Sequence, residues 1–102
     1  MAVRYVNCFK VREGAEELFL ERWRPINAYM TAKPGYLNDR LHRSLDPAAT
    51  YRFVNYIEWE SAELHVAAHD EGFRALISEE WRAAVQSTAA LYEVIHEGAR
   101  PN

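Results

Sequence analysis

The sequence predicts an α+β fold, in which helices cover one face of an antiparallel β-sheet. Hydrophobic side chains alternate with a period of two in several segments, and segments with helical spacing lie between them. At 102 residues the chain has material for one hydrophobic core, because two cores would each be too small to remain folded. Residues 1–98 are therefore expected to form a single domain, and residues 99–102 a flexible C-terminal tail.

Two different periods indicate the first strand and the first helix. The odd positions of residues 3–11 are mostly apolar, which predicts a strand with one hydrophobic face. After this strand, one helical stripe is formed by Phe19, Trp23, Ile26 and Met30. The helix should run from about residue 15 to residue 31, with a kink or break near Arg24, because Pro25 removes a backbone hydrogen bond.

A β-hairpin should follow this helix. A turn at Lys33-Pro34-Gly35 precedes a strand at residues 36–44, and Asp46-Pro47 begins the connection to a strand at residues 51–59. One face of the second strand is aromatic and β-branched with a single asparagine, and consists of Tyr51, Phe53, Asn55, Ile57 and Trp59. The two strands are expected to pair antiparallel.

The rest of the chain should form a broken helical segment and a last strand. Ser61 and Asp70 are potential N-caps, and the second helix would carry Phe73, Leu76, Ile77 and Trp81. Residues 88–96 fit the last strand. The order strand, helix, strand, strand, helices, strand is that of a ferredoxin-like βαββαβ sandwich.

Such a sandwich leaves one face of its sheet without helices. In this sequence that face would carry Val6, Val54 and Tyr56, which are too apolar to remain in water as a group. The same face of a second copy is the simplest cover, so a homodimer is expected.

Composition and charge exclude several classes of protein. The net charge is -3 and the basic residues are scattered, which argues against nucleic acid or a membrane as partner. The first ten residues lack the apolar core of a signal peptide, and Cys8 alone cannot form an internal disulfide, so a cytoplasmic protein is expected. Phosphate-binding loops and nucleophile elbows are absent from the sequence, and nucleotide cofactors are not expected.

Residues 51–61, with Pro34-Gly35-Tyr36 and Leu41-His42-Arg43-Ser44 before them, resemble the antibiotic biosynthesis monooxygenase family. The resemblance covers nearly the whole chain, and its most specific part is Asn-x-x-x-Trp-Glu-Ser from Asn55 to Ser61. It implies a dimeric α+β barrel of ferredoxin-like protomers. It also implies oxidation of flat aromatic polyketides, such as anthrones, by O2 without metal, flavin or haem.

The resemblance also suggests which residues act. Asn55 and Trp59 match the residues assigned to substrate deprotonation and oxygen activation, and Arg74 matches an arginine of the helical segment. His65 stands where such members have a hydrogen-bonding tyrosine, so proton handling should differ here. The side chains expected around the substrate are Asn7, Phe19, Trp23, Tyr51 and Phe53.

A second branch of the superfamily degrades haem and is similar to this chain at Asn7. That branch also requires a helical tryptophan and a haem-ligating histidine. The matching positions here are Ala67 or Ala68 and Ile77, so haem degradation is the less favoured function.

The chemistry of single residues leaves alternatives open. Asn7 and Asn55 share the apolar face of the sheet, where each amide must bond either to the backbone or to a ligand. His65 could act as a general base, because imidazole titrates near neutral pH. His65 and His69 could also form a metal pair, but no third ligand follows at a supporting spacing, so no metal is expected.

The leading hypothesis is a cofactor-independent monooxygenase that acts on a flat aromatic or polyketide-like molecule of the anthrone or quinol type. A dimeric module that binds a small aromatic ligand without catalysis is the first alternative. An isomerase or cyclase on the same scaffold is the second, because one fold can host several activities.

Overall fold

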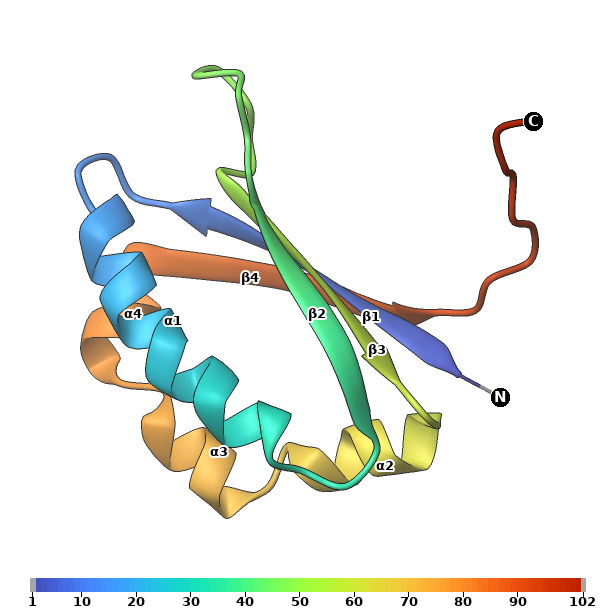
Figure 1. The fold of residues 1–102 in the computed structure, drawn as a ribbon. Helices are drawn as coiled ribbons and strands as arrows, with labels where there is room; N and C mark the ends of the chain where they lie inside the picture. The colour runs from blue at the N-terminus through green and yellow to red at the C-terminus, as the bar shows by residue number, and fades with distance from the viewer. Residues whose placement is uncertain (1, 102) are drawn as a thin grey trace.

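The computed structural model describes residues 2–101 and shows a four-stranded antiparallel sheet with helices on one face (Figure 1). The strands are β1 (Val3–Val11), β2 (Tyr36–Arg43), β3 (Phe53–Trp59) and β4 (Val85–Tyr92). Their spatial order is β2-β3-β1-β4, and each neighbouring pair is antiparallel. The predicted ferredoxin-like α+β fold is therefore confirmed.

The first helix, α1 (Glu16–Thr31), is continuous through Pro25, so a break near Arg24 is wrong and the alternative of a kink stays a prediction. Side chains on both sides of the proline are buried, namely Phe19 before it and Ile26 and Met30 after it. Because these side chains belong to one core, packing holds the helix together where Pro25 removes a backbone hydrogen bond.

Three short helices connect β3 to β4: α2 (Ala62–Ala68), α3 (Glu71–Leu76) and α4 (Glu79–Ala84). Ser61 and Asp70 cap α2 and α3 as predicted, by accepting hydrogen bonds from backbone amides three residues later. Ser78 caps α4 in the same way, at 3.1 Å from the amide of Trp81. This third cap divides the predicted second helix into two, so Trp81 lies on a helix of its own.

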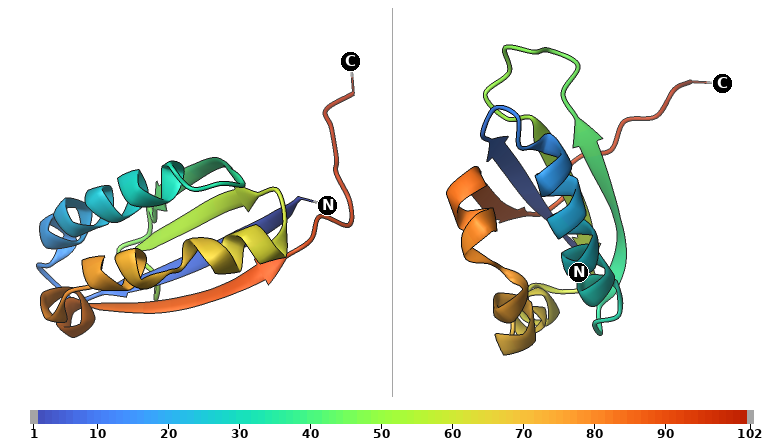
Figure 2. Two further views of the ribbon diagram at one scale, coloured as in Figure 1. Left: turned by 90° about the horizontal axis from the view of Figure 1, so that it is seen from below. Right: turned by 90° about the vertical axis from the view of Figure 1, so that its left-hand side faces the viewer.

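The last strand begins three residues before the predicted start and ends at Tyr92 rather than His96. Its limits follow from its partner, because β4 pairs with β1 from Val11↔Val85 to Arg4↔Tyr92. Beyond the Arg4↔Tyr92 pair only Val3 of β1 remains, and residues 93–101 extend away from the domain (Figures 1 and 2). Strand β3 likewise begins at Phe53, two residues later than predicted.

The helices form one layer against the odd-numbered face of β1 and β3 (Figure 2). Four cross-strand pairs follow one another along this face: Phe9↔Phe53, Asn7↔Asn55, Tyr5↔Ile57 and Val3↔Trp59. The antiparallel register thus places the two predicted asparagines opposite each other in the middle of the helix-covered face.

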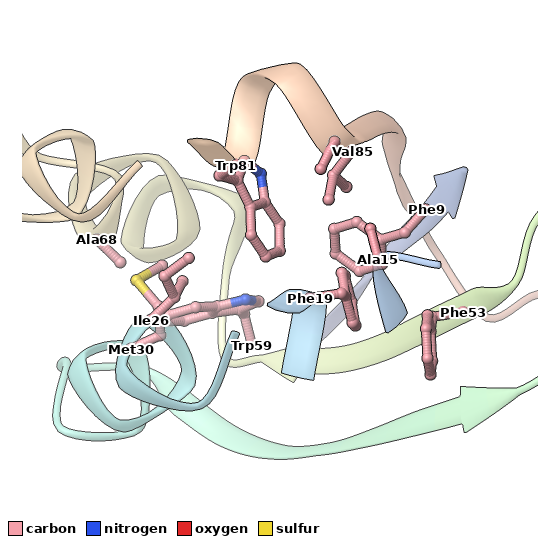
Figure 3. Close-up of a cluster of buried hydrophobic side chains, with 11 residues drawn as sticks. Phe9, Ala15, Phe19, Ile26, Met30, Phe53, Trp59, Ala68, Trp81 and Val85 are labelled. Atoms are coloured by element: carbon pink, nitrogen blue, oxygen red, sulfur yellow. The ribbon is translucent and has the colours of Figure 1, made fainter. Parts of the chain in front are cut away.

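The hydrophobic core extends along this layer, and its stacked aromatic rings lie at one end (Figure 3). Phe19 of α1 stacks on Phe53 with ring centroids 4.4 Å apart and on Trp81 at 5.1 Å. Phe9 meets Phe19 and Trp81 edge to face.

Among the residues that the structure describes, no helix is both long and apolar enough to cross a membrane.

Candidate active site

A cavity of about 100 Å³ lies between the sheet and the helices, and part of it is open to solvent. Its wall is mostly apolar, with Trp23, Ile26 and Met30 from α1 and Trp59 from β3. Figure 3 shows Trp59 beside Ile26 and Met30, away from the packed phenylalanines. A largely apolar cavity with few polar groups is typical of sites for small organic molecules.

Two facing amides form part of this wall. Asn7 and Asn55 line the cavity and are direct cross-strand partners. Their Oδ1 atoms are sealed from solvent and have no hydrogen-bond partner within residues 2–101. A buried amide without partners costs roughly 1–3 kcal/mol in mutational data. The fold therefore keeps two costly hydrogen-bond acceptors in side chains that line a cavity, where only a donor group of a ligand can complete their hydrogen bonds.

Trp59 places a third polar atom near the amides. Its side chain is 1% exposed, and its Nε1–H lacks an acceptor among the described residues. Its indole contacts Tyr36 and His65 edge to face, with centroids 5.8 and 5.7 Å away. These contacts fix a flat apolar wall that also offers one hydrogen-bond donor.

The two histidines of the α2 region differ in position. His65 is 7% exposed and packs on Tyr5 with ring centroids 4.3 Å apart, whereas His69 lines the cavity. Burial, and the neighbouring His69, lower the pKa of His65 to about 4, so its ring is neutral at neutral pH. Its Nδ1 has no partner in the described part of the chain.

Two tyrosines complete the polar lining. Burial raises the pKa of Tyr5, which keeps its phenol protonated. Burial and the Asp39 carboxylate, which accepts a hydrogen bond from the hydroxyl, raise the pKa of Tyr36. Asn27 Nδ2 donates to the other oxygen of Asp39 at 3.0 Å, which links α1 to β2 beside the cavity.

The cavity brings together some of the predicted site residues. Asn7, Trp23, Asn55 and Trp59 line it, and His65 lies directly behind Tyr5 and Trp59. The other predicted residues lie elsewhere in residues 2–101 and are described next.

Besides His65, four predicted site residues are absent from the described cavity lining. Phe19 and Phe53 are stacked in the core, and Tyr51 precedes β3. Arg74 is on α3, where its Nη1 donates to the backbone oxygen of His69 at 2.9 Å. In the β1–β3 register, Phe53 pairs with Phe9 one step beyond the two asparagines, and its ring stacks on Phe19 in the core.

Sequence reasoning did not assign a cavity position to Tyr5, Asn27, Tyr36 or His69. The period of two placed Tyr5 on the same face as the asparagines, and this was the one available signal. His69 was noted only as a possible metal partner of His65. The structure shows no group of three or more histidine, cysteine, aspartate or glutamate side chains able to hold a metal within residues 2–101.

Comparison with known proteins identifies the family of this chain. The model of the antibiotic biosynthesis monooxygenase family matches residues 2–87. The chain belongs to this family. The protein YczJ of Bacillus subtilis (strain 168), described as uncharacterized, is 28% identical over 82 residues, which cover 79% of this chain and 80% of YczJ.

Solved structures show the same fold. A candidate monooxygenase from Shewanella loihica PV-4 is 32% identical, with a TM-score of 0.81 over 94% of this chain and 96% of that chain. SnoaB, a cofactor-independent oxygenase from Streptomyces nogalater, is 24% identical, with a TM-score of 0.80 over 94% of this chain and 95% of its own. The second likeness concerns the fold alone.

Proposed function

We propose that this protein is a cofactor-independent monooxygenase that oxidises a flat aromatic or polyketide-like molecule of the anthrone or quinol type with O2. Membership of the antibiotic biosynthesis monooxygenase family supports a monooxygenase-like role. The observation that carries the proposal is the cavity wall of Asn7, Asn55 and Trp59, with sealed and unpartnered polar atoms beside an apolar surface.

This wall suits a substrate that becomes an anion during the reaction. Removal of a proton from an anthrone carbon or a phenol leaves an electron-rich carbanion or phenolate that can reduce O2 directly. The unpartnered indole Nε1–H of Trp59 and the Nδ2–H of Asn55 would donate hydrogen bonds to the developing oxyanion, while the unpartnered Oδ1 of Asn55 would accept one from a substrate hydroxyl. Such donors act strongly in a water-poor cavity, because their dipoles are already oriented.

The overall reaction balances without a further reductant. A CH2 group and O2 give a peroxide at the substrate carbon; loss of the remaining C–H proton and cleavage of the O–O bond then give a carbonyl and water. The substrate carbon is oxidised, and both atoms of O2 are reduced, one ending in the carbonyl and one in water. The protein supplies orientation, desolvation and proton transfer.

The size of the cavity limits what it can enclose. Its volume of about 100 Å³ is below the roughly 300–1,000 Å³ common for ligand sites. One ring of the substrate would therefore lie between Trp59 and the amides, while the remainder would reach the open side. A one-ring quinol should fit without movement of the wall, and a three-ring anthrone should project from it.

Oxygen uptake by metal-free protein in the presence of a chelator tests the proposal. Quinol and anthrone substrates would be compared for the wild type, Asn55→Ala and Asn38→Ala. Asn38 is an exposed β2 asparagine bonded to Glu58, so its variant is the matched control. Loss of one donor to a developing oxyanion costs about 10²–10³-fold in rate. We expect this loss for Asn55→Ala and none for Asn38→Ala.

Three results would contradict the proposal. Equal uptake by Asn55→Ala and the wild type would remove the role of the amide. Ligand binding without oxygen uptake would favour a binding module, and turnover without oxygen would favour an isomerase or cyclase.

We also propose that the helix-free face of the sheet pairs with a second copy of the chain. Val6 is the cross-strand partner of both Tyr56 and Ala90, which makes an uncharged row at the centre of this face, and Tyr56 is 45% exposed. Arg4, Arg40 and Glu58 lie beside this row. Because the face carries charges of both signs, a two-fold axis can place basic groups opposite acidic ones.

Cys8 also belongs to this face, as the partner of Val54 and Thr88, and it is half-buried.

Sedimentation would measure the mass of the wild type, Val6→Lys and Leu45→Lys. Leu45 is 98% exposed in the loop after β2, so its variant controls for added charge. A dimer that only Val6→Lys dissociates is expected, whereas a wild-type monomer at micromolar concentration would refute the pairing.

A further inference from the structure

The polar lining of the cavity contains few groups able to exchange a proton. In the described part of the lining, the ionisable side chains are Tyr5, Tyr36 and His69, and no carboxylate or ammonium reaches the wall. Tyr5 keeps its proton because burial raises its pKa, and Tyr36 donates its own to Asp39. Of these three side chains, only His69 has an imidazole ring, the most common general base of enzymes.

The hydrogen bond of His69 fixes which ring nitrogen is free. Its Nδ1 lies 2.7 Å from the backbone oxygen of His65. A carbonyl oxygen only accepts hydrogen bonds, so Nδ1 must carry the hydrogen and donate it. The neutral ring therefore has its lone pair on Nε2, which makes no hydrogen bond to any residue in the range 2–101.

The surroundings of His69 hold this arrangement. Tyr5 of β1 and Phe73 of α3, both in the cavity wall, contact the ring edge to face at 5.6 and 4.7 Å. On the α2 side, the ring of His65 lies 4.4 Å away. Arg74 bonds to the backbone oxygen of His69 rather than to its ring.

His65 supports a proton on His69 because it stays uncharged. Burial makes His65 hard to protonate, and two adjacent imidazolium rings would repel each other. With His65 neutral, His69 can become positive without a like charge beside it. Its Nδ1–H bond to the backbone also strengthens when the ring is charged.

We propose that Nε2 of His69 is the base that takes the substrate proton, and that His65 is a positioning residue that holds its tautomer. This assignment rests on the proposed monooxygenase function and names the proton acceptor for it. It differs from the expectation that His65 is the base.

The protons balance because the same imidazole ring first accepts a proton and then donates it. The substrate C–H or O–H bond breaks, its electron pair stays on the substrate, and the proton moves to Nε2. The imidazolium then gives this proton to the peroxide anion formed with O2. Nε2 next removes the second C–H proton as the O–O bond breaks, and the departing hydroxide takes that proton to become water.

The first test needs no turnover. 4-Nitrophenol, whose anion absorbs differently from the neutral phenol, would be bound to the wild type, His69→Asn and His96→Asn. His69→Asn keeps a side-chain N–H for the His65 carbonyl but has no basic nitrogen, and His96 lies in the exposed C-terminal segment. We expect the bound phenol to be ionised in the wild type and His96→Asn and neutral in His69→Asn. The same ionisation state in all three, or no binding, would overturn the assignment.

The second test separates this assignment from the proposed function. With a substrate that the wild type oxidises, kcat of His69→Asn should fall about 10²–10⁴-fold with little change in KM, and added imidazole should restore part of it. Unchanged kcat would overturn the base while leaving the monooxygenase intact. Ionisation of 4-nitrophenol through His69 in a protein that consumes no oxygen would support the base and refute the monooxygenase.

Discussion

Two regions of the same helix-covered sheet face differ in their packing and in the polar groups they bury. At the Phe9↔Phe53 end, four aromatic rings stack and meet edge to face, and their side chains are 0–6% exposed. At the Tyr5↔Ile57 end, the neighbouring side chains include His65 and His69, and the wall between the two ends carries unpartnered amide oxygens. The aromatic end has the composition of a core, and the polar end that of a site.

The two ends contribute to the stability of this domain with opposite signs. Stacked rings bury apolar area and add favourable ring contacts. Buried amides and an imidazole without partners cost free energy that a packed apolar core would not. A small domain keeps such groups when a ligand uses them, so the two ends should respond differently to substitution.

The largest expected effect is at the aromatic end. Phe19→Ala removes a fully buried ring that contacts Phe9, Phe53 and Trp81, which should lower the free energy of unfolding by about 3–5 kcal/mol. Urea unfolding followed by tryptophan fluorescence measures this. A loss below about 1 kcal/mol would show that this end is not the main source of stability.

The next effect is a pH dependence that comes from the polar end. The pKa of His65 is lowered to about 4 in the folded protein, while an unfolded imidazole has a pKa near 6.5. Below pH ~6.5 the unfolded chain binds a proton that the folded chain does not, so stability is greatest above this pH and falls as the pH drops towards 4. The full loss is at most about 3 kcal/mol.

Urea unfolding between pH 8 and about pH 5 would measure this slope in the wild type and in His65→Phe. The phenyl ring keeps the packing on Tyr5 and Trp59 but cannot bind a proton. We expect a smaller slope in the variant, and equal slopes would assign the pH dependence to other groups.

The difference between the two ends also explains what could be predicted from the sequence. A period of two and a helical stripe put Phe9, Phe19 and Phe53 on apolar faces, which meet in the core, although Phe19 and Phe53 were expected around the substrate. The same period placed Asn7 and Asn55 on one face, but only the strand register made them direct partners. The fold and the amide pair were thus within reach of sequence reasoning.

The positions of the histidines could not be predicted from the sequence. Whether His65 or His69 reaches the cavity depends on how α2 turns into α3, which Asp70 determines by capping α3 and by bonding to Tyr29 and Lys33. These contacts join residues 37 and 41 positions apart and leave no local pattern. The early start of β4 escaped prediction for the same reason, since pairing with β1 decides it, whereas the split at Ser78 has a local signal, a serine cap three residues before Trp81.

A third substitution tests the cost of the amides directly. Asn55→Leu replaces an unpartnered buried amide with an apolar side chain of similar size, which should leave stability unchanged or raise it by about 1 kcal/mol. Oxygen uptake should be lost in the same variant. A loss of more than about 1 kcal/mol would mean that Asn55 is a structural residue, and the two ends would then not differ in principle.

The smallest effect compares two helix caps. Ser61→Ala and Ser78→Ala each remove one hydrogen bond to a backbone amide, and each should lower the free energy of unfolding by about 1 kcal/mol. Ser61 begins α2, which carries His65, whereas Ser78 begins α4, which carries Trp81. Matched losses of stability are expected, but only Ser61→Ala should also slow oxygen uptake, because it loosens the helix whose carbonyl holds His69. Equal activity in both variants would show that the backbone of α2 does not position the base.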